Sequence, residues 1–188
     1  MAILKAIFVD FDGTLVDSEL ANAHAYRLAL QEVGISCSLQ TLESLIIGNH
    51  WSQFLPKIVG AGYSAELGQD IATRKKKQYS TFYHSINVNI PLVKLLTNLS
   101  PNISLAVVSN ASQDSINDIL AAKELGQLFK FVIGSEDFKK GKPDPEPYVL
   151  AMKKLNILPD ECLAIEDSEA GFQSATAAGI KILKVQIS

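Results

Sequence analysis

The chain has 188 residues, a length typical of one domain or of one domain with an insertion. Hydrophobic residues make up 47% of it and charged residues 20%, which excludes a disordered chain and a fibrous repeat. The net charge of −3 offers no general attraction to nucleic acid or to an anionic membrane, so we expect neither as a partner. The two cysteines, Cys37 and Cys162, lie far apart, and no apolar segment approaches ~20 residues. We therefore expect a soluble cytoplasmic protein.

Five short apolar runs rich in Ile and Val occur along the chain, at 3–9, 103–108, 131–133, 163–165 and 182–185. Continuous rather than alternating apolar runs are typical of strands that are buried on both faces. Helical patterns follow or separate these runs; one begins at an N-cap, Ser112, and another at Pro145. The alternation predicts an α/β fold with a Rossmann-like parallel sheet covered by helices.

The segment between Val16 and Pro91 breaks this alternation, because it shows helical spacing and no strand pattern. Its first helical pattern stops at Gly34, and further helices are predicted over 39–47, over 51–59 and from the Ser64 cap towards Tyr83. We therefore predict an α/β catalytic core formed by residues 1–15 and 92–188, and an inserted helical cap domain over residues 16–91.

Two carboxylates follow the first predicted strand directly, in the segment Asp10-Phe11-Asp12-Gly13-Thr14. Ligands bind at the carboxyl ends of the strands in a parallel sheet, and alternation along an extended chain would point Asp10 and Asp12 the same way. Two carboxylates about 6 Å apart repel each other, so the pair calls for a cation or a proton between them. Taken alone, the segment could also be a capping aspartate followed by an Asp-Gly turn.

Three later segments carry polar residues at or after the ends of strands: Ser109-Asn110, Lys142 and Glu166-Asp167. Each also has an ordinary structural explanation, respectively a helix cap, a solvated loop charge and acidic residues at a helix N-terminus. Together they combine carboxylates for a hard divalent cation such as Mg²⁺, a hydroxyl donor, and a lysine that acts as a point charge on phosphate. This combination favours phosphoryl transfer, in which positioning and charge neutralisation supply most of the catalysis.

The ordered set of these segments resembles the haloacid dehalogenase (HAD) superfamily, in the helical-cap branch that holds β-phosphoglucomutase-like and phosphoglycolate phosphatase-like proteins. The resemblance covers nearly the whole chain. It implies a HAD-type phosphoric monoester hydrolase, a Mg²⁺-dependent phosphatase acting on a small phosphorylated metabolite such as a sugar phosphate. The dehalogenases of the superfamily lack the second aspartate of the first motif, so the presence of Asp12 favours a phosphorylated substrate over a halogenated one.

The resemblance also implies a role for each motif residue. Asp10 matches the nucleophile that becomes an aspartyl-phosphate, and Asp12 matches the general acid that later serves as a base. Ser109 matches the donor to the phosphoryl oxygens, and Asn110 lies beside it in the phosphate-binding segment. Lys142 matches the cation that balances charge on the phosphate and steadies the nucleophile.

The metal ligands implied by the resemblance are the carboxylates of Asp10 and Asp167 and the backbone carbonyl of Asp12. Glu166 would be either a further ligand or an outer partner. A carboxylate 4 Å from one phosphate charge is opposed by about 4 kcal/mol at an effective dielectric of 20, so a bound Mg²⁺ is needed for the attack.

Four residues of the predicted cap are substrate candidates: Asn22, His50, Trp51 and Lys75. Asn22 stands where the similar β-phosphoglucomutases carry a histidine, and Trp51 where they carry a phosphate-holding arginine; both departures weaken the mutase interpretation. Lys75 aligns with a cap lysine that faces substrate in that branch, although a run of cations is usually a solvated helix face. His50 and Trp51 could equally pack within the cap.

Two alternatives remain open at this point: a phosphomutase of the same branch, which would need a bisphosphate activator, and a non-catalytic phosphate-binding module. We expect a monomer or a weak dimer. Related proteins commonly continue for another strand and helix beyond the position that matches Val185, so we also expect a trimmed sheet edge.

Overall fold

The computed structural model describes residues 3–46 and 51–185. Within it the chain forms two compact units, one made of Met1–Asp17 with Asn87–Ser188 and the other of Ser18–Ile86. Each unit has its own buried apolar cluster, so each is described by itself. Among the described residues, no helix combines the length and the apolar character needed to cross a bilayer.

The larger unit is built on a five-stranded sheet in the order β5-β4-β1-β6-β7. Every pair of neighbours in this sheet is parallel. The strands are β1 (Ala6–Val9), β4 (Ser104–Val108), β5 (Phe131–Ile133), β6 (Cys162–Glu166) and β7 (Lys181–Lys184). All five match predicted apolar runs, and the predicted α/β fold class is confirmed.

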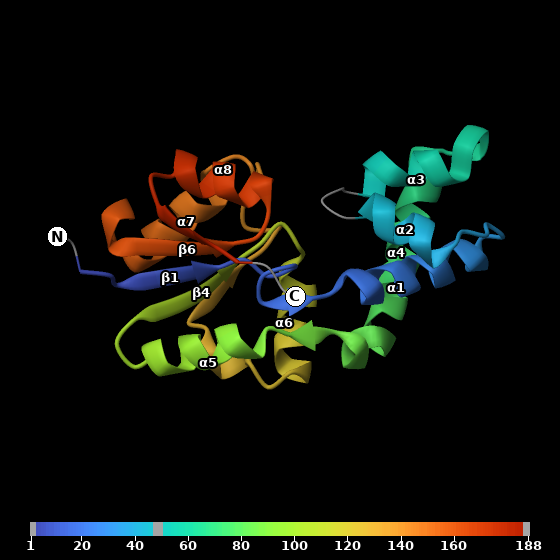
Figure 1. The fold of residues 1–188 in the computed structure, drawn as a ribbon. Helices are drawn as coiled ribbons and strands as arrows, with labels where there is room; N and C mark the ends of the chain where they lie inside the picture. The colour runs from blue at the N-terminus through green and yellow to red at the C-terminus, as the bar shows by residue number, and fades with distance from the viewer. Residues whose placement is uncertain (1–2, 47–50, 186–188) are drawn as a thin grey trace. The chain divides into compact units, whose positions relative to one another are not determined.

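Helices cover both faces of this sheet (Figure 1). One face carries α7 (Glu146–Leu155) and α8 (Glu169–Ala177), and the other carries α5 (Ile90–Leu99) and α6 (Gln113–Ala122). Ser112 caps α6 as predicted, because its hydroxyl accepts from the Ser115 amide. Pro145 is the N-cap of α7, so that helix begins one residue later than predicted. The single turns η3 (Gly126–Leu128) and η4 (Pro159–Glu161) complete this unit.

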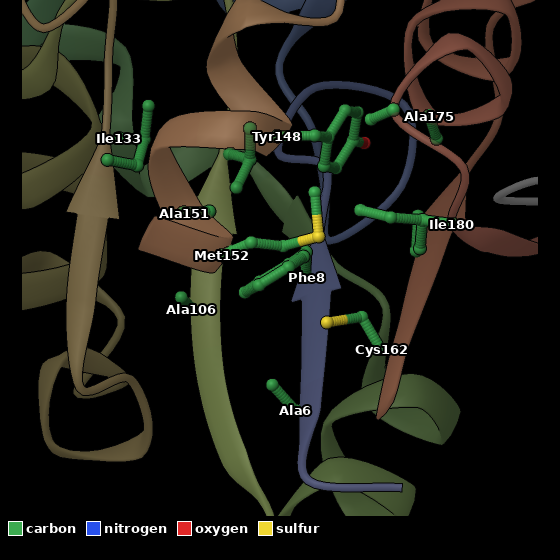
Figure 2. Packing of buried hydrophobic residues seen from close by; sticks show 13 residues of the cluster. Ala6, Phe8, Ala106, Ile133, Tyr148, Ala151, Met152, Cys162, Ala175 and Ile180 are labelled. Atoms are coloured by element: carbon green, nitrogen blue, oxygen red, sulfur yellow. The ribbon is translucent and has the colours of Figure 1, made fainter. Parts of the chain in front are cut away.

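The apolar cluster between the sheet and α7 shows why alternate residues of each strand are small or apolar (Figure 2). Phe8 of the central strand packs against Met152 and Tyr148 of α7, with Ala106 and Cys162 contributed by the flanking strands. All four residues of β1 are buried, so the strand is packed on both of its faces. The carboxyl end of β1 is therefore a well-supported place for reactive groups.

The smaller unit contains α1 (Glu19–Glu32), α2 (Leu39–Ile46), α3 (Trp51–Val59) and α4 (Ala65–Tyr79), with short 3-10 helices η1 (Gly60–Gly62) and η2 (Ser80–Ser85). Its core is formed by apolar residues from all four helices, including Leu30, Leu42, Phe54 and Ile71. Helical periodicity predicted these helices because their apolar stripes face one another. The Ser64 hydroxyl caps α4 by accepting from the Leu67 amide at 3.1 Å.

The prediction of no strand between Val16 and Pro91 is wrong at both ends of that range. Two-residue strands β2 (Val16–Asp17) and β3 (Asn87–Val88) pair in an antiparallel ladder. The physical reason is that so short a pair is set by where the chain leaves and re-enters the larger unit, and two residues carry no periodicity. Both strands belong to the larger unit.

Candidate active site

The predicted core residues collect at the carboxyl ends of three adjacent strands. Asp10 follows the central strand β1, Ser109 follows β4, and Glu166 is the last residue of β6. The Asp10 amide donates to the Ile165 carbonyl at 2.9 Å, which extends the β1–β6 ladder to the first carboxylate. Because parallel strands end together at one edge, residues far apart in the sequence become neighbours here.

Lys142 brings the only positive charge into this cluster among the residues the structure describes there. Its ammonium donates to Asp10 Oδ1 at 2.6 Å, to Glu166 Oε1 at 2.5 Å and to the Val108 carbonyl at 2.7 Å. Burial by itself would lower the pKa of Lys142, but the charges of Asp10 and Glu166 outweigh it and raise that pKa above its ordinary value. The lysine therefore remains an ammonium that holds two carboxylates.

Glu166 is held by a second donor that is also buried. The Tyr148 hydroxyl, which comes from α7, donates to the same Oε1 atom that accepts from Lys142. Burial and then the charge of Asp10 raise the pKa of Glu166 to about 7, against the opposing effect of Lys142 and Tyr148. Burial, together with the nearby charge of Asp10, thus outweighs the two donors that favour the carboxylate.

Asp167 adds a third carboxylate, and the group has the composition of a site for a hard cation. One oxygen each from Asp10, Glu166 and Asp167 lie within 4.8 Å of one another. The Thr14 hydroxyl orients Asp167 by donating to Oδ1 at 3.0 Å. Burial and then the charge of Asp10 raise the pKa of Asp167, which is the signature of repulsion that a divalent cation would relieve. Oxygen donors in this density fit Mg²⁺.

Asp12 lies in the turn after β1 and is half-buried. Gly13 permits that turn through its positive φ of 81°, and a Cβ there would overlap the Asp167 carboxylate. The Asp-Gly turn that could by itself have explained this segment is thus present, and it packs against the Asp167 carboxylate. The group of three carboxylate oxygens within 4.8 Å of one another is formed by Asp10, Glu166 and Asp167, and Asp12 lies beside it in sequence, two residues after Asp10.

The Ser109-Asn110 segment divides into two different roles. Ser109 is buried, and its hydroxyl oxygen accepts from the Ala111 amide at 3.0 Å, so its proton can be donated elsewhere. The Asn110 side chain binds the backbone of Lys142 at both ends, accepting from its amide at 2.8 Å and donating to its carbonyl at 3.1 Å. Asn110, predicted beside the phosphate, is therefore engaged in holding the lysine loop.

The predicted substrate residues lie in the helical unit, apart from His50, which is outside the described residues. Asn22 is half-buried on α1, and Trp51 packs against the apolar core of the unit at the start of α3. The Lys75 ammonium lies 3.7 Å from the centre of the Tyr79 ring and 5.4 Å from that of Tyr26. Lys75 is therefore half-buried against aromatic faces, unlike its exposed neighbours Lys76 and Lys77.

A family model described as haloacid dehalogenase-like hydrolase matches residues 7–185, nearly the whole chain. The chain belongs to this family. The resemblance stated from the motifs is thereby confirmed, as is the predicted class of enzyme, a HAD-type hydrolase.

Several proteins similar to this HAD hydrolase are named as enzymes of phosphorylated small molecules. It is 27% identical over 180 residues to a phosphorylated carbohydrates phosphatase of Thermotoga maritima, covering 95% of this chain and 83% of that protein. It is 30% identical over 184 residues to a phosphoglycolate phosphatase of Aliivibrio fischeri, covering 94% and 81%. Among solved structures, a β-phosphoglucomutase of Clostridium difficile is 25% identical with a TM-score of 0.76, covering 96% and 83%.

Sequence patterns did not point to two residues of the HAD hydrolase site, Thr14 and Tyr148. Thr14 lies within the first motif segment, and its buried position beside Asp167 could have been suspected from that location alone. Tyr148 lies on the buried face of α7, among apolar residues. A tyrosine on an otherwise apolar helix face requires a partner for its hydroxyl, and that requirement is the signal that would have marked it.

Proposed function

We propose that this HAD hydrolase is a Mg²⁺-dependent phosphatase that hydrolyses a small phosphorylated metabolite through an aspartyl-phosphate on Asp10. The observation that carries the proposal is the buried Lys142 ammonium joined to Asp10 beside a group of three carboxylates. A lysine alone would make a salt bridge, but the surplus of carboxylates beside it calls for a divalent cation, which could in turn bind a substrate phosphate. Relatives named as phosphatases support the same chemistry.

Mg²⁺ is the group that this donor set fits, and Asp10 and Asp167 would hold it with their carboxylates while Asp12 supplies its backbone carbonyl. When bound, the ion neutralises charge on the transferred phosphoryl group. Glu166 adds to the negative charge of the site. Without such neutralisation, attack by the Asp10 carboxylate on a phosphate would be opposed by about 4 kcal/mol for each phosphate charge at 4 Å.

In the first step we propose that an Asp10 carboxylate oxygen forms a bond to phosphorus while the bond from phosphorus to the alcohol oxygen breaks. Asp12 donates its proton to that leaving oxygen, so the alcohol departs neutral. Ser109 keeps its proton and donates a hydrogen bond from its hydroxyl to a phosphoryl oxygen. Lys142 remains an ammonium and balances the charge of the phosphoryl group, because its pKa is held above the ordinary value.

In the second step Asp12, now a carboxylate, takes a proton from a water molecule that attacks phosphorus. The bond between phosphorus and the Asp10 oxygen breaks, which releases inorganic phosphate and restores the Asp10 carboxylate. Both steps use the same four side chains. Splitting one displacement into two lets a single proton carrier act first as an acid and then as a base.

We further infer that the helical unit, Ser18–Ile86, acts as the cap that selects the substrate. Lys75 is its strongest candidate, because its half-buried ammonium is placed against the Tyr79 ring, unlike the exposed cations that follow it. Asn22 and Trp51 are the other described candidates. Comparing turnover of sugar phosphates, phosphoglycolate and nucleotides identifies the phosphomonoester that these cap residues favour.

The Asp10→Asn variant tests the proposed function. Wild-type protein should release phosphate from at least one member of a panel of sugar phosphates, phosphoglycolate and nucleotides with MgCl₂, and from none with EDTA. Asp10→Asn should lower kcat by about 10³-fold or more while thermal unfolding shows a folded protein, because the nucleophile is lost. Asp160→Asn, a change at an exposed aspartate, is the matched control and should keep wild-type turnover.

Turnover that survives in Asp10→Asn, or that is equal with EDTA, would contradict the covalent metal-dependent route. Turnover that appears only after a sugar bisphosphate is added, with transfer to a second sugar hydroxyl rather than to water, would indicate a phosphomutase instead.

A further inference from the structure

Tyr148 is a tyrosine where packing alone would accept phenylalanine. Its side chain is fully buried in the core between α7 and the sheet, with its ring centroid 6.3 Å from that of Phe8 (Figure 2). Its hydroxyl reaches out of this apolar cluster to Glu166. Burial and then the charge of Glu166 raise the pKa of Tyr148 well above its ordinary value, so the hydroxyl stays protonated and donates.

The Oε1 atom of Glu166 receives two donors, the Tyr148 hydroxyl and the Lys142 ammonium at 2.5 Å. A carboxylate oxygen has two lone pairs, so this atom is fully used within the protein. The other oxygen, Oε2, lies 3.4 Å from the Ser168 hydroxyl. It is also packed so closely against Gly171 that a Cβ there would overlap it.

These contacts form a chain that runs from the apolar core to the reacting carboxylate: Tyr148 to Glu166, Glu166 to Lys142, and Lys142 to Asp10. Asp167, in contrast, accepts from the neutral hydroxyl of Thr14 and is only half-buried. The two adjacent acids of the last motif are therefore supported in different ways. One is enclosed by protein donors, and the other keeps oxygen lone pairs for a cation.

We propose that Tyr148 is a positioning residue that, together with Lys142, commits Glu166 to the lysine and leaves the cation to Asp10 and Asp167. This inference rests on the proposed function and specifies how its site is held. The competing arrangement makes Glu166 a metal ligand with Tyr148 as its outer hydrogen-bond partner. Loss of such an outer partner typically weakens metal binding by about 10–100-fold.

Tyr148→Phe separates the two arrangements because it removes one hydroxyl without changing the charge of the site. MgCl₂ binding is measured by titration calorimetry, and kcat and KM are measured with p-nitrophenyl phosphate. We expect kcat to fall about tenfold with KM little changed, while the Mg²⁺ dissociation constant weakens by less than about threefold. Tyr63→Phe, a half-buried tyrosine of the helical unit, is the matched control and should match the wild type.

Two results for Tyr148→Phe would overturn the proposal. Mg²⁺ binding weakened tenfold or more would make Glu166 a ligand, and a kcat within about twofold of the wild type would leave Tyr148 with packing alone. A wild type without measurable Mg²⁺ binding would also overturn it, because there would be no cation from which Glu166 is withheld.

A second pair of variants keeps the test independent of Tyr148→Phe and of catalysis. Glu166→Gln should retain saturable Mg²⁺ binding, whereas Asp167→Asn should weaken it by about tenfold or more. Equal loss in both variants would contradict the assignment. If the wild type binds Mg²⁺ but hydrolyses no phosphomonoester, the proposed function is wrong. The titrations would still decide whether Glu166 binds the cation or only Lys142.

Discussion

At the scale of single residues, the site is defined by an imbalance of charge. Three carboxylates, Asp10, Glu166 and Asp167, surround one ammonium, Lys142, in a largely buried position. Buried charges are tolerated when each is paired and hydrogen-bonded, and one lysine cannot pair three acids. Burial and then the charge of Asp10 raise the pKa of Glu166 and of Asp167, and the surplus of negative charge makes the site suited to a divalent cation.

The buried thiol of Cys162 provides a pH-dependent prediction at this scale. Burial, with smaller effects of Glu161 and Asp160, raises the pKa of Cys162 to about 11 from its ordinary value of 9.0. A raised folded-state pKa means that folding favours the thiol. Its contribution to stability is complete below about pH 9 and is lost as the pH rises through about 11.

We therefore expect a thiol-specific disulfide reagent at pH 8 to label half-buried Cys37 in the native protein and to leave Cys162 unmodified. Denaturant should expose both thiols, and raising the pH towards 11 should accelerate the labelling of Cys162. In Cys37→Ser the fast phase should vanish. Fast labelling of native Cys162 at pH 8 would show that it is not buried.

At the scale of elements, the end of β6 and the first turn of α8 are fitted to each other. Ser168 caps α8 by accepting from the Gly171 amide at 3.1 Å, which brings the backbone of Gly171 onto the Glu166 carboxylate. Only a residue without a Cβ leaves room for that approach. The start of the helix therefore packs against Oε2 of Glu166, whereas Lys142 and Tyr148 donate to Oε1.

Gly171→Ala should accordingly destabilise the protein by about 1–3 kcal/mol in urea unfolding, because the new Cβ collides with a buried carboxylate. This is opposite to the usual effect of alanine in a helix interior, which is favourable by about 1 kcal/mol. Gly126→Ala, where no atom lies within 4 Å of the added Cβ, is the matched control and should be close to neutral. Equal stability of the two variants would contradict the contact.

At the scale of the whole molecule, the helical unit is an insertion between two residues that pair with each other. Asp17 of β2 is the register partner of Asn87 of β3, and the helical unit runs from Ser18 to Ile86 between them. The five-stranded sheet and the apolar core of the α/β unit are therefore formed by residues of that unit. A substrate-selecting unit can be inserted there without interrupting the sheet.

Replacing residues 18–86 with Asn-Gly should convert β2 and β3 into a two-residue hairpin, the loop length and sequence that such antiparallel pairs favour. We expect the shortened chain to unfold in one cooperative transition and to keep its stabilisation by MgCl₂, while losing discrimination among phosphomonoesters. Circular dichroism and calorimetry measure the first two properties. A chain without a cooperative transition would show that the α/β unit needs the helical unit to fold.

Much of the fold could be predicted because buried parallel strands have continuous apolar sequences. The runs that became β1, β4, β5, β6 and β7 were each recognisable, as were the four helices of the inserted unit from their apolar stripes. The β2–β3 pair was not predictable, since two residues carry no pattern. α5 was also left unnamed; its signals are Asn89, which caps it, and the proline in its first turn.

The sequence by itself determined the chemical inventory of this protein: two aspartates after the first strand, a Ser-Asn segment, a lysine and a second acidic pair, in an order typical of HAD hydrolases. Local patterns suffice for that because each motif sits at the end of its own strand or loop. Only the tertiary structure decided which groups touch. Lys142 meets Asp10 across 132 residues of chain, Tyr148 joins Glu166, and Asn110 binds the lysine backbone. Such contacts depend on how strands and helices pack, and packing over long sequence separations leaves no periodic trace in the chain.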